Sequence, residues 1–95
     1  MRDFDFGNTT PVRITRHAQE QWQSRLSQSA LMGHRLNQNT WYKAEIVNAP
    51  SADCDEQRLY TIRGHRDMLL CGKYHPNETS VVTVLYADYD RLSRI

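Results

Sequence analysis

The sequence lacks the features that mark membrane and exported proteins. No apolar run approaches the ~20 residues that a transmembrane helix needs, and the first six residues, which include two acids, predict no signal peptide. Its only two cysteines, Cys54 and Cys71, stand far apart, so we expect free thiols in the reducing cytosol. These absences predict a cytoplasmic protein with no membrane partner, and its 95 residues fit a single domain spanning 1–95.

Short catalytic signatures are also missing. The sequence contains no glycine-rich phosphate loop, no H-E-x-x-H and no G-x-S-x-G. Cys71 lies between His65 and His75, yet no Cys-x-x-Cys pair and no i,i+4 histidine pair supports zinc binding. We therefore expect no metal and no cofactor.

The sequence has little net charge, but its basic and acidic residues are concentrated in separate segments. The net charge of +1 excludes a protein that coats nucleic acid by bulk electrostatics. Residues 11–43 nevertheless carry a net +4 and residues 58–75 a net +3, separated by a segment of −4 over 44–57. All four histidines lie in the two basic segments: His17, His34, His65 and His75. A neutral protein can therefore still form one focused basic site.

The first half of the chain predicts helices. Thr15 is a suitable N-cap for a helix from Arg16 to about Ala30. This stretch has no glycine or proline, and its apolar residues recur at every fourth position: Ala18, Trp22, Leu26 and Ala30. A loop over 31–39 precedes a second helix, predicted over Trp41–Asn48 with Thr40 as its cap and with its end before Pro50.

The second half predicts strands over 58–63, 68–74 and 79–86, joined by tight turns. Strands joined by tight turns pair antiparallel, because parallel pairing needs a long crossover. The predicted fold is α+β, with one or two N-terminal helices packed on a three- to four-stranded antiparallel sheet.

Several side chains in these elements suit phosphodiester chemistry. Helical spacing puts His17, Gln21, Ser24 and Gln28 on one surface, with Arg25 beside them. Strand alternation puts Lys73 and His75 on one face, and Tyr86 near them if the register permits. A base, a phosphate-binding cation and an acid are what metal-free cleavage needs. The alternative is a solvated helix flank, a solvated Lys73 and a Tyr86 that anchors the core.

The stretch Ile14–Leu26 resembles the first helix of a family of small bacterial and phage proteins, which reads roughly [ST]-x-H-A-x-x-R-M-x-x-R. These proteins are similar to the RelE/ParE toxins of the barnase–colicin–RelE group. His17, Ala18 and Arg25 match the motif, Trp22 takes the methionine position, and Gln21 replaces the first arginine. The final V-V-T-V-L-Y strand also fits the family.

The resemblance implies a helical layer against a four-stranded antiparallel sheet. RelE-type members cut mRNA, often on the ribosome, using Arg, Lys, Tyr or His side chains. ParE-type members act on gyrase without nuclease chemistry, so the fold alone does not decide the function.

The leading hypothesis is a toxin-type, metal-free endoribonuclease with RNA and a cognate antitoxin as partners. His17 or His75 would be the base, and Tyr86 or a second histidine would be the acid. Charge on the phosphorane would be stabilised by Arg25, Arg63 and Lys73. The predicted RNA-binding residues are four of the seven arginines in the basic segments: Arg25, Arg58, Arg63 and Arg66.

Two alternatives remain. A non-catalytic module that inhibits a host protein complex is favoured by the near-neutral charge and by Gln21, because an amide cannot replace a guanidinium. A domain that binds nucleic acid without cleaving it would show a steep salt dependence and no turnover.

Overall fold

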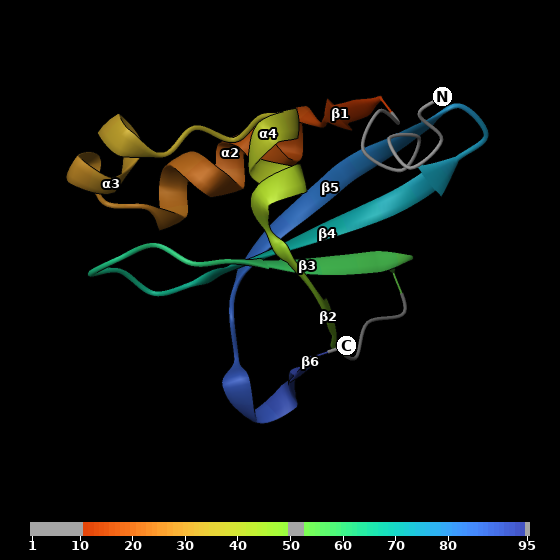
Figure 1. Ribbon diagram of the computed structural model, residues 1–95. Coiled ribbons are helices and arrows are strands. Elements are labelled where there is room, and N and C mark those ends of the chain that lie inside the picture. The colour runs from red at the N-terminus through yellow and green to blue at the C-terminus, as the bar shows by residue number, and fades with distance from the viewer. Residues whose placement is uncertain (1–10, 50–52, 95) are drawn as a thin grey trace, which may run out of the picture.

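The computed structural model describes residues 11–49 and 53–94, in which helices cover one face of a six-stranded sheet (Figure 1). The strand order is β1-β5-β4-β3-β2-β6. The strands are β1 (Val12–Ile14), β2 (Glu45–Asn48), β3 (Glu56–Tyr60), β4 (Met68–His75), β5 (Glu78–Tyr86) and β6 (Ser93–Arg94). The helices are α2 (Arg16–Arg25), α3 (Gln28–Gly33), α4 (Gln38–Lys43) and the short 3₁₀ helix η2 (Tyr89–Arg91).

The α+β class and the antiparallel β3-β4-β5 meander are confirmed. The sheet itself differs from the expectation, because it is wider and mixed. The lead-in β1 runs parallel to β5, pairing Val12 with Thr79 and Ile14 with Val81. Three residues are too few to show a periodic strand pattern, so β1 left no clear signal in the sequence.

The predicted helix over Trp41–Asn48 is wrong in its second half. Helix α4 ends at Lys43, Ala44 is extended with φ −74° and ψ 148°, and the next residues form β2 against β3. The β-branched Ile46 and Val47 favour a strand once a partner is available. Asn37, not Thr40, caps α4, and the Thr40 side chain completes the reciprocal capping box.

The long first helix predicted over Arg16–Ala30 is two helices. Thr15 caps α2 as expected, accepting the N–H of Ala18, but Leu26 is extended and Ser27 caps α3. Because the helix breaks at Leu26, Gln28 belongs to α3, and the helical spacing that had placed it on one surface with His17 does not apply.

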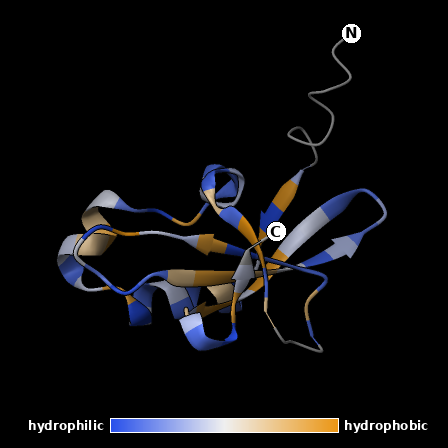
Figure 2. Ribbon diagram, turned by 60° about the horizontal axis from the view of Figure 1, so that its bottom comes forward, coloured by the Kyte–Doolittle hydropathy of each residue, from blue (hydrophilic) through white to orange (hydrophobic). Residues whose placement is uncertain are grey.

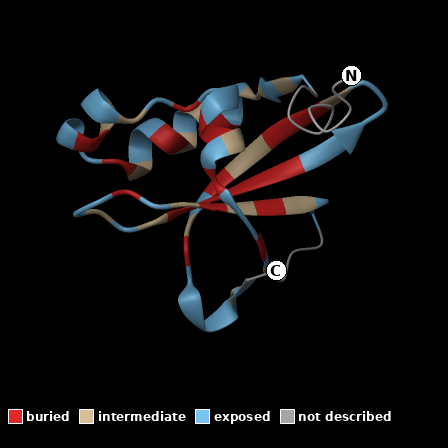
Figure 3. Cartoon of the chain, in the orientation of Figure 1, coloured by how far each residue is buried: buried red, intermediate tan, exposed pale blue. Residues whose placement is uncertain are grey.

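The core lies on both faces of the sheet (Figure 3). Trp22 of α2 and Trp41 of α4 pack with Leu70, Val81 and Val84 under the helices. A smaller cluster on the opposite face contains Val47, Leu59, Leu69 and Ala87.

A β-bulge beside Gly72 turns both Val81 and Val84 towards the helices. Simple alternation had put these two residues on opposite faces, and the extra residue of the bulge corrects that assignment. The indole of Trp41 lies against Gly72, where a Cβ would come within 2.6 Å of Trp41 Cη2.

Hydrophobic residues lie along the strands, while the residues at the tip of the β4–β5 hairpin are hydrophilic (Figure 2). Within the described part of the chain, no helix has the length and apolar character to cross a membrane.

Candidate functional site

The polar flank of α2 covers an open edge of β5. Strand β1 pairs only as far as Val81, and Val84 lies beyond it. The N–H of Val84 donates to Gln21 Oε1 (2.8 Å), and its carbonyl accepts from Arg25 Nε (2.8 Å). The hydroxyl of Thr83 also donates to Gln21 Oε1. Gln21 therefore supplies an acceptor, which the guanidinium of an arginine at this position would lack.

A cluster of cations and one aromatic ring lies where α2 ends. The Cζ of Arg66 is 4.2 Å from the ring centroid of Tyr86, and the Cζ of Arg25 is 5.5 Å from it. The Tyr86 hydroxyl donates to the Arg25 carbonyl (2.8 Å), which ties the end of β5 to the end of α2. We call Arg25, His65, Arg66 and Tyr86 the arginine–tyrosine cluster.

The β3–β4 loop brings Arg66 to the Tyr86 ring and His65 to the backbone of Ser27. A turn is closed by the hydrogen bond from His65 N to the Ile62 carbonyl (3.1 Å), and Gly64 adopts φ +75° within it. Asp67 Oδ1 accepts the N–H of Ile62 (3.3 Å) and holds the loop closed. The exposed Arg63 and Arg66 project from this loop.

The His65 ring contacts two backbone groups, a carbonyl that accepts a hydrogen bond and an N–H that donates one. Its Nδ1 is 2.8 Å from the Arg66 carbonyl, which can only accept, so Nδ1 carries the proton. Its Nε2 is 3.4 Å from the N–H of Ser27, which can only donate, so Nε2 presents a lone pair. Both contacts together favour the tautomer in which Nδ1 carries the proton and Nε2 presents a lone pair.

The arginines of this region carry uncompensated charge. Arg25, Arg63 and Arg66 form no ion pair within residues 11–49 and 53–94. In the same range, three other arginines do pair, Arg13 with Glu78, Arg16 with Glu20 and Arg58 with Glu56, whereas Arg35 and Arg91 form no ion pair. Unpaired guanidiniums around an aromatic ring form a surface suited to anions and planar groups.

The remaining predicted catalytic residues lie elsewhere. His75 pairs with Glu78 at the hairpin end of β4, whereas Tyr86 pairs with Met68 at the other end. Seven residues of strand separate the two ends, which is about 23 Å. Lys73 and His75 are exposed on the opposite face from Tyr86, so the prediction that the three lie together is wrong. The register of a hairpin cannot be inferred from alternation alone.

His17 and Arg58 also lie outside the cluster. His17 is exposed in the first turn of α2, eight residues or about 12 Å before Arg25. Arg58 is largely buried, bonded to Glu56, and stacked with its Cζ 4.5 Å from the Trp41 ring. Its Nη1 donates to the Trp41 carbonyl (3.1 Å), so Arg58 fastens α4 to the sheet.

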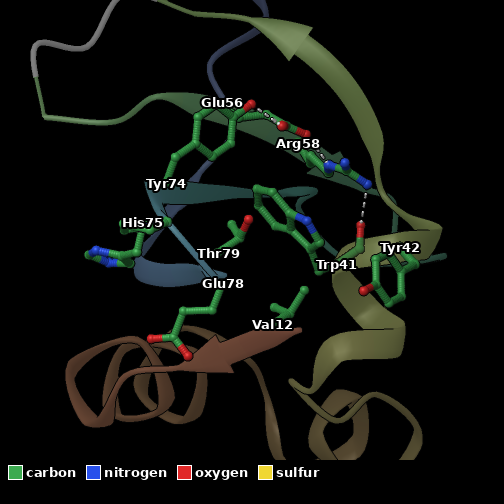
Figure 4. Close-up of a pocket in the computed structure, with 10 residues that line it drawn as sticks. Val12, Trp41, Tyr42, Glu56, Arg58, Tyr74, His75, Glu78 and Thr79 are labelled. Atoms are coloured by element: carbon green, nitrogen blue, oxygen red, sulfur yellow. Dashed lines mark hydrogen bonds and ion pairs between the residues drawn. The ribbon is translucent and has the colours of Figure 1, made fainter. Parts of the chain in front are cut away.

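A cavity of about 280 Å³ opens beside Trp41 at the hairpin end of the sheet (Figure 4). Tyr74 lies at its edge, and the hydrogen bond that it donates to Glu56 raises the pKa of Tyr74 to about 12. On the other face of β4, burial and the neighbouring Cys54 raise the pKa of the Cys71 thiol to about 12. No three His, Cys, Asp or Glu side chains gather as metal ligands within the described ranges.

The family model described as "Putative RelE superfamily toxin domain" matches residues 14–88, more than three quarters of the chain. The chain belongs to this family of toxin domains. The match includes α2, the meander and every member of the arginine–tyrosine cluster. Comparisons with curated proteins and with solved structures find no match.

Sequence reasoning did not reveal the structural roles of three residues in this RelE superfamily domain: Gln21, Ser27 and His65. Ser27 carries a readable signal, since it caps a helix that a single 15-residue periodicity conceals. The roles of Gln21 and His65 depend on contacts with residues 63 and 38 positions away, which no local pattern reveals.

Proposed function

We propose that this RelE superfamily domain is a toxin that cleaves RNA at the arginine–tyrosine cluster without a metal ion. The observation that carries the proposal is the packing of the Arg25 and Arg66 guanidiniums against the Tyr86 ring, next to the lone pair of His65 Nε2. Guanidiniums bind phosphate in bidentate fashion, and aromatic and guanidinium planes stack on unpaired RNA bases.

In this mechanism, His65 Nε2 accepts the proton of a ribose 2′-hydroxyl, and its contact with Ser27 N–H at 3.4 Å is long enough to be exchanged for one with substrate. The freed oxygen attacks phosphorus, the bond to the 5′-oxygen breaks, and the products end in a 2′,3′-cyclic phosphate and a 5′-hydroxyl. Arg66 and Arg63 stabilise the charge that develops on the phosphorane.

Tyr86 acts as a positioning residue in this mechanism. Its hydroxyl already donates to the Arg25 carbonyl, so its proton holds the fold together instead of serving the leaving group. The leaving 5′-oxygen then takes its proton from water, and we expect slow cleavage for that reason.

The test is cleavage of a defined RNA by the purified protein in the presence of EDTA. We expect 2′,3′-cyclic phosphate ends, with the rate reduced about 100-fold or more in His65→Ala and in Arg66→Ala. The matched control is Arg16→Ala, at an exposed arginine in the first turn of α2, nine residues or about 14 Å of helix before Arg25. Cleavage that EDTA abolishes, or that survives both cluster substitutions, contradicts the proposal.

A second function is favoured by the same hydrogen bonds. Both ring nitrogens of His65 and the hydroxyl of Tyr86 are engaged within the protein, as expected of a surface that binds without catalysis. The chain would then be a toxin that inhibits a host protein complex. One stoichiometric protein partner, with intact RNA after induced expression, supports this function, whereas growth arrest with RNA decay supports cleavage. In either case we expect a cognate antitoxin as a partner.

A further inference from the structure

The cavity beside Trp41 has a floor, walls and a mouth that come from four separate strands and a helix. Thr79 of β5 and Val12 of β1 form the floor, Trp41 of α4 and Arg58 of β3 form one wall, and Tyr74 of β4 flanks the mouth (Figure 4). The lining is held rigidly, because Arg58 bonds to Glu56 and to the Trp41 carbonyl. A volume of about 280 Å³ suits a single small ring system.

A buried hydroxyl in this cavity lacks a partner. Thr79 is only 8% exposed, and its hydroxyl has no hydrogen bond to any described residue. Its methyl group lies towards Gly72, and Figure 4 shows the hydroxyl pointing between the rings of Tyr74 and Trp41. Buried polar groups nearly always find a partner, so an unpaired one that points into a cavity indicates a ligand.

The charged groups of the cavity are mostly paired, which favours a neutral ligand. Glu56 pairs with Arg58 and Glu78 pairs with Arg13, while the exposed His75 also lines the cavity. The Tyr74 hydroxyl bonded to Glu56 stays protonated at neutral pH. Arg58 retains unused N–H donors, Glu56 retains acceptor lone pairs, and Thr79 offers both functions. Tyr74, 55% exposed, leaves part of its ring free for stacking.

We propose that this cavity binds a purine nucleobase. A purine is flat, neutral and large enough to stack on Tyr74, and it carries donors and acceptors that can reach Thr79 and the Glu56–Arg58 pair. The site lies six residues of strand, about 20 Å, from Tyr86, so it is separate from the arginine–tyrosine cluster. The proposal therefore does not depend on RNA cleavage.

The experiment is saturation-transfer NMR of the full chain with adenosine and guanosine, which carry no phosphate to bind the cluster. Cytidine and uridine serve as comparison ligands. The variants are Thr79→Val, which removes the hydroxyl and keeps the shape, and Tyr74→Ala, which removes the ring. Their matched controls are Thr61→Val, at an exposed threonine, and Tyr89→Ala, at a tyrosine 52% exposed.

We expect purine ring protons to receive saturation, and the dissociation constant to rise at least about fivefold in each cavity variant and in neither control. Thr79→Val should leave the urea midpoint unchanged or raised, because it removes an unpaired buried hydroxyl, so loss of binding cannot be ascribed to unfolding. Absence of purine binding, equal binding of pyrimidine nucleosides, or binding unaffected by both cavity variants overturns the proposal.

A second arm asks where the base comes from. A short oligouridine containing one adenine should displace adenosine better than plain oligouridine if the site reads a base within RNA. Equal competition, with adenosine bound, assigns the site to free nucleosides or nucleotides. An Arg66→Ala protein that still binds adenosine, with RNA cleavage lost, separates this site from the arginine–tyrosine cluster.

Discussion

Replacing Gln21 by arginine tests whether this position serves the fold or phosphate binding. Gln21→Arg introduces the arginine that the resemblance led us to expect at this position, but it removes the acceptor for Val84 N–H and for the Thr83 hydroxyl. Losing a net hydrogen bond costs about 1 kcal/mol, and leaving the part-buried N–H of Val84 unpaired adds about 1–2 kcal/mol. The new guanidinium would also lie one turn of helix from Arg25.

We therefore expect the free energy of unfolding to fall by about 2–3 kcal/mol, measured by urea denaturation with an unchanged m-value. For a domain of this size the melting temperature should fall on the order of 10–20 °C. The matched control is Gln21→Glu, which keeps an acceptor beside Arg25 and should stay within about 0.5 kcal/mol of the parent. A Gln21→Arg protein as stable as the parent refutes our reasoning, and one that also gains RNA cleavage assigns the position to phosphate binding.

Three further predictions follow from the sheet. Gly72→Ala should destabilise the fold by about 1–3 kcal/mol in urea denaturation, because the new Cβ meets Trp41 Cη2 at 2.6 Å. The pKa of Tyr74, raised from 10.0 to about 12, adds stability that is complete below about pH 10 and is lost as the pH rises through about 12, and Tyr74→Phe should remove this pH dependence. In native protein a thiol reagent should label the partly exposed Cys54 and spare the fully buried Cys71, as mass spectrometry would show.

Each of these has a result that would contradict it. A Gly72→Ala protein of unchanged stability would mean that the indole of Trp41 moves without cost. An identical pH profile for Tyr74→Phe would deny the bond to Glu56. Equal labelling rates for the two cysteines would show that Cys71 is accessible in the folded protein.

Local sequence patterns predicted the parts of the fold that depend on neighbouring residues. Thr15 as a helix cap and the tight turn between β4 and β5 are set by side chains within a few positions, and the structure confirms them. The predicted tight turn between the first two strands of the meander is wrong, because β3 ends at Tyr60 and the seven residues 61–67 connect it to β4. The spacing of Ile46 and Val47 relative to Trp41 and Ala44 predicts a helix. The sequence pattern does not reveal that β3 is available to pair with these residues as a strand. Pairing with β3, which lies about ten residues further along the chain, makes this segment the strand β2.

In the candidate site too, local patterns predicted some residues, while long-range contacts decided where those residues lie. Arg25 and Arg66 were predicted as RNA-binding residues from charge alone, and the structure places both against Tyr86. Their position there depends on the register of β4 with β5 and on the break between α2 and α3, and neither follows from alternation. Lys73 and His75 were assigned to the same site because the register was unknown.

The salt dependence of RNA binding tests the central claim most directly. The ligand is a single-stranded RNA with 2′-O-methyl riboses, which cannot be cleaved, and binding is followed by fluorescence anisotropy. Three phosphate contacts, from Arg25, Arg63 and Arg66, predict a slope of log K against log salt of about −2. Arg66→Ala should weaken binding and reduce that slope by about 0.7, while Arg16→Ala leaves both unchanged. A slope and an affinity that Arg66→Ala leaves unaltered would contradict RNA binding at the arginine–tyrosine cluster.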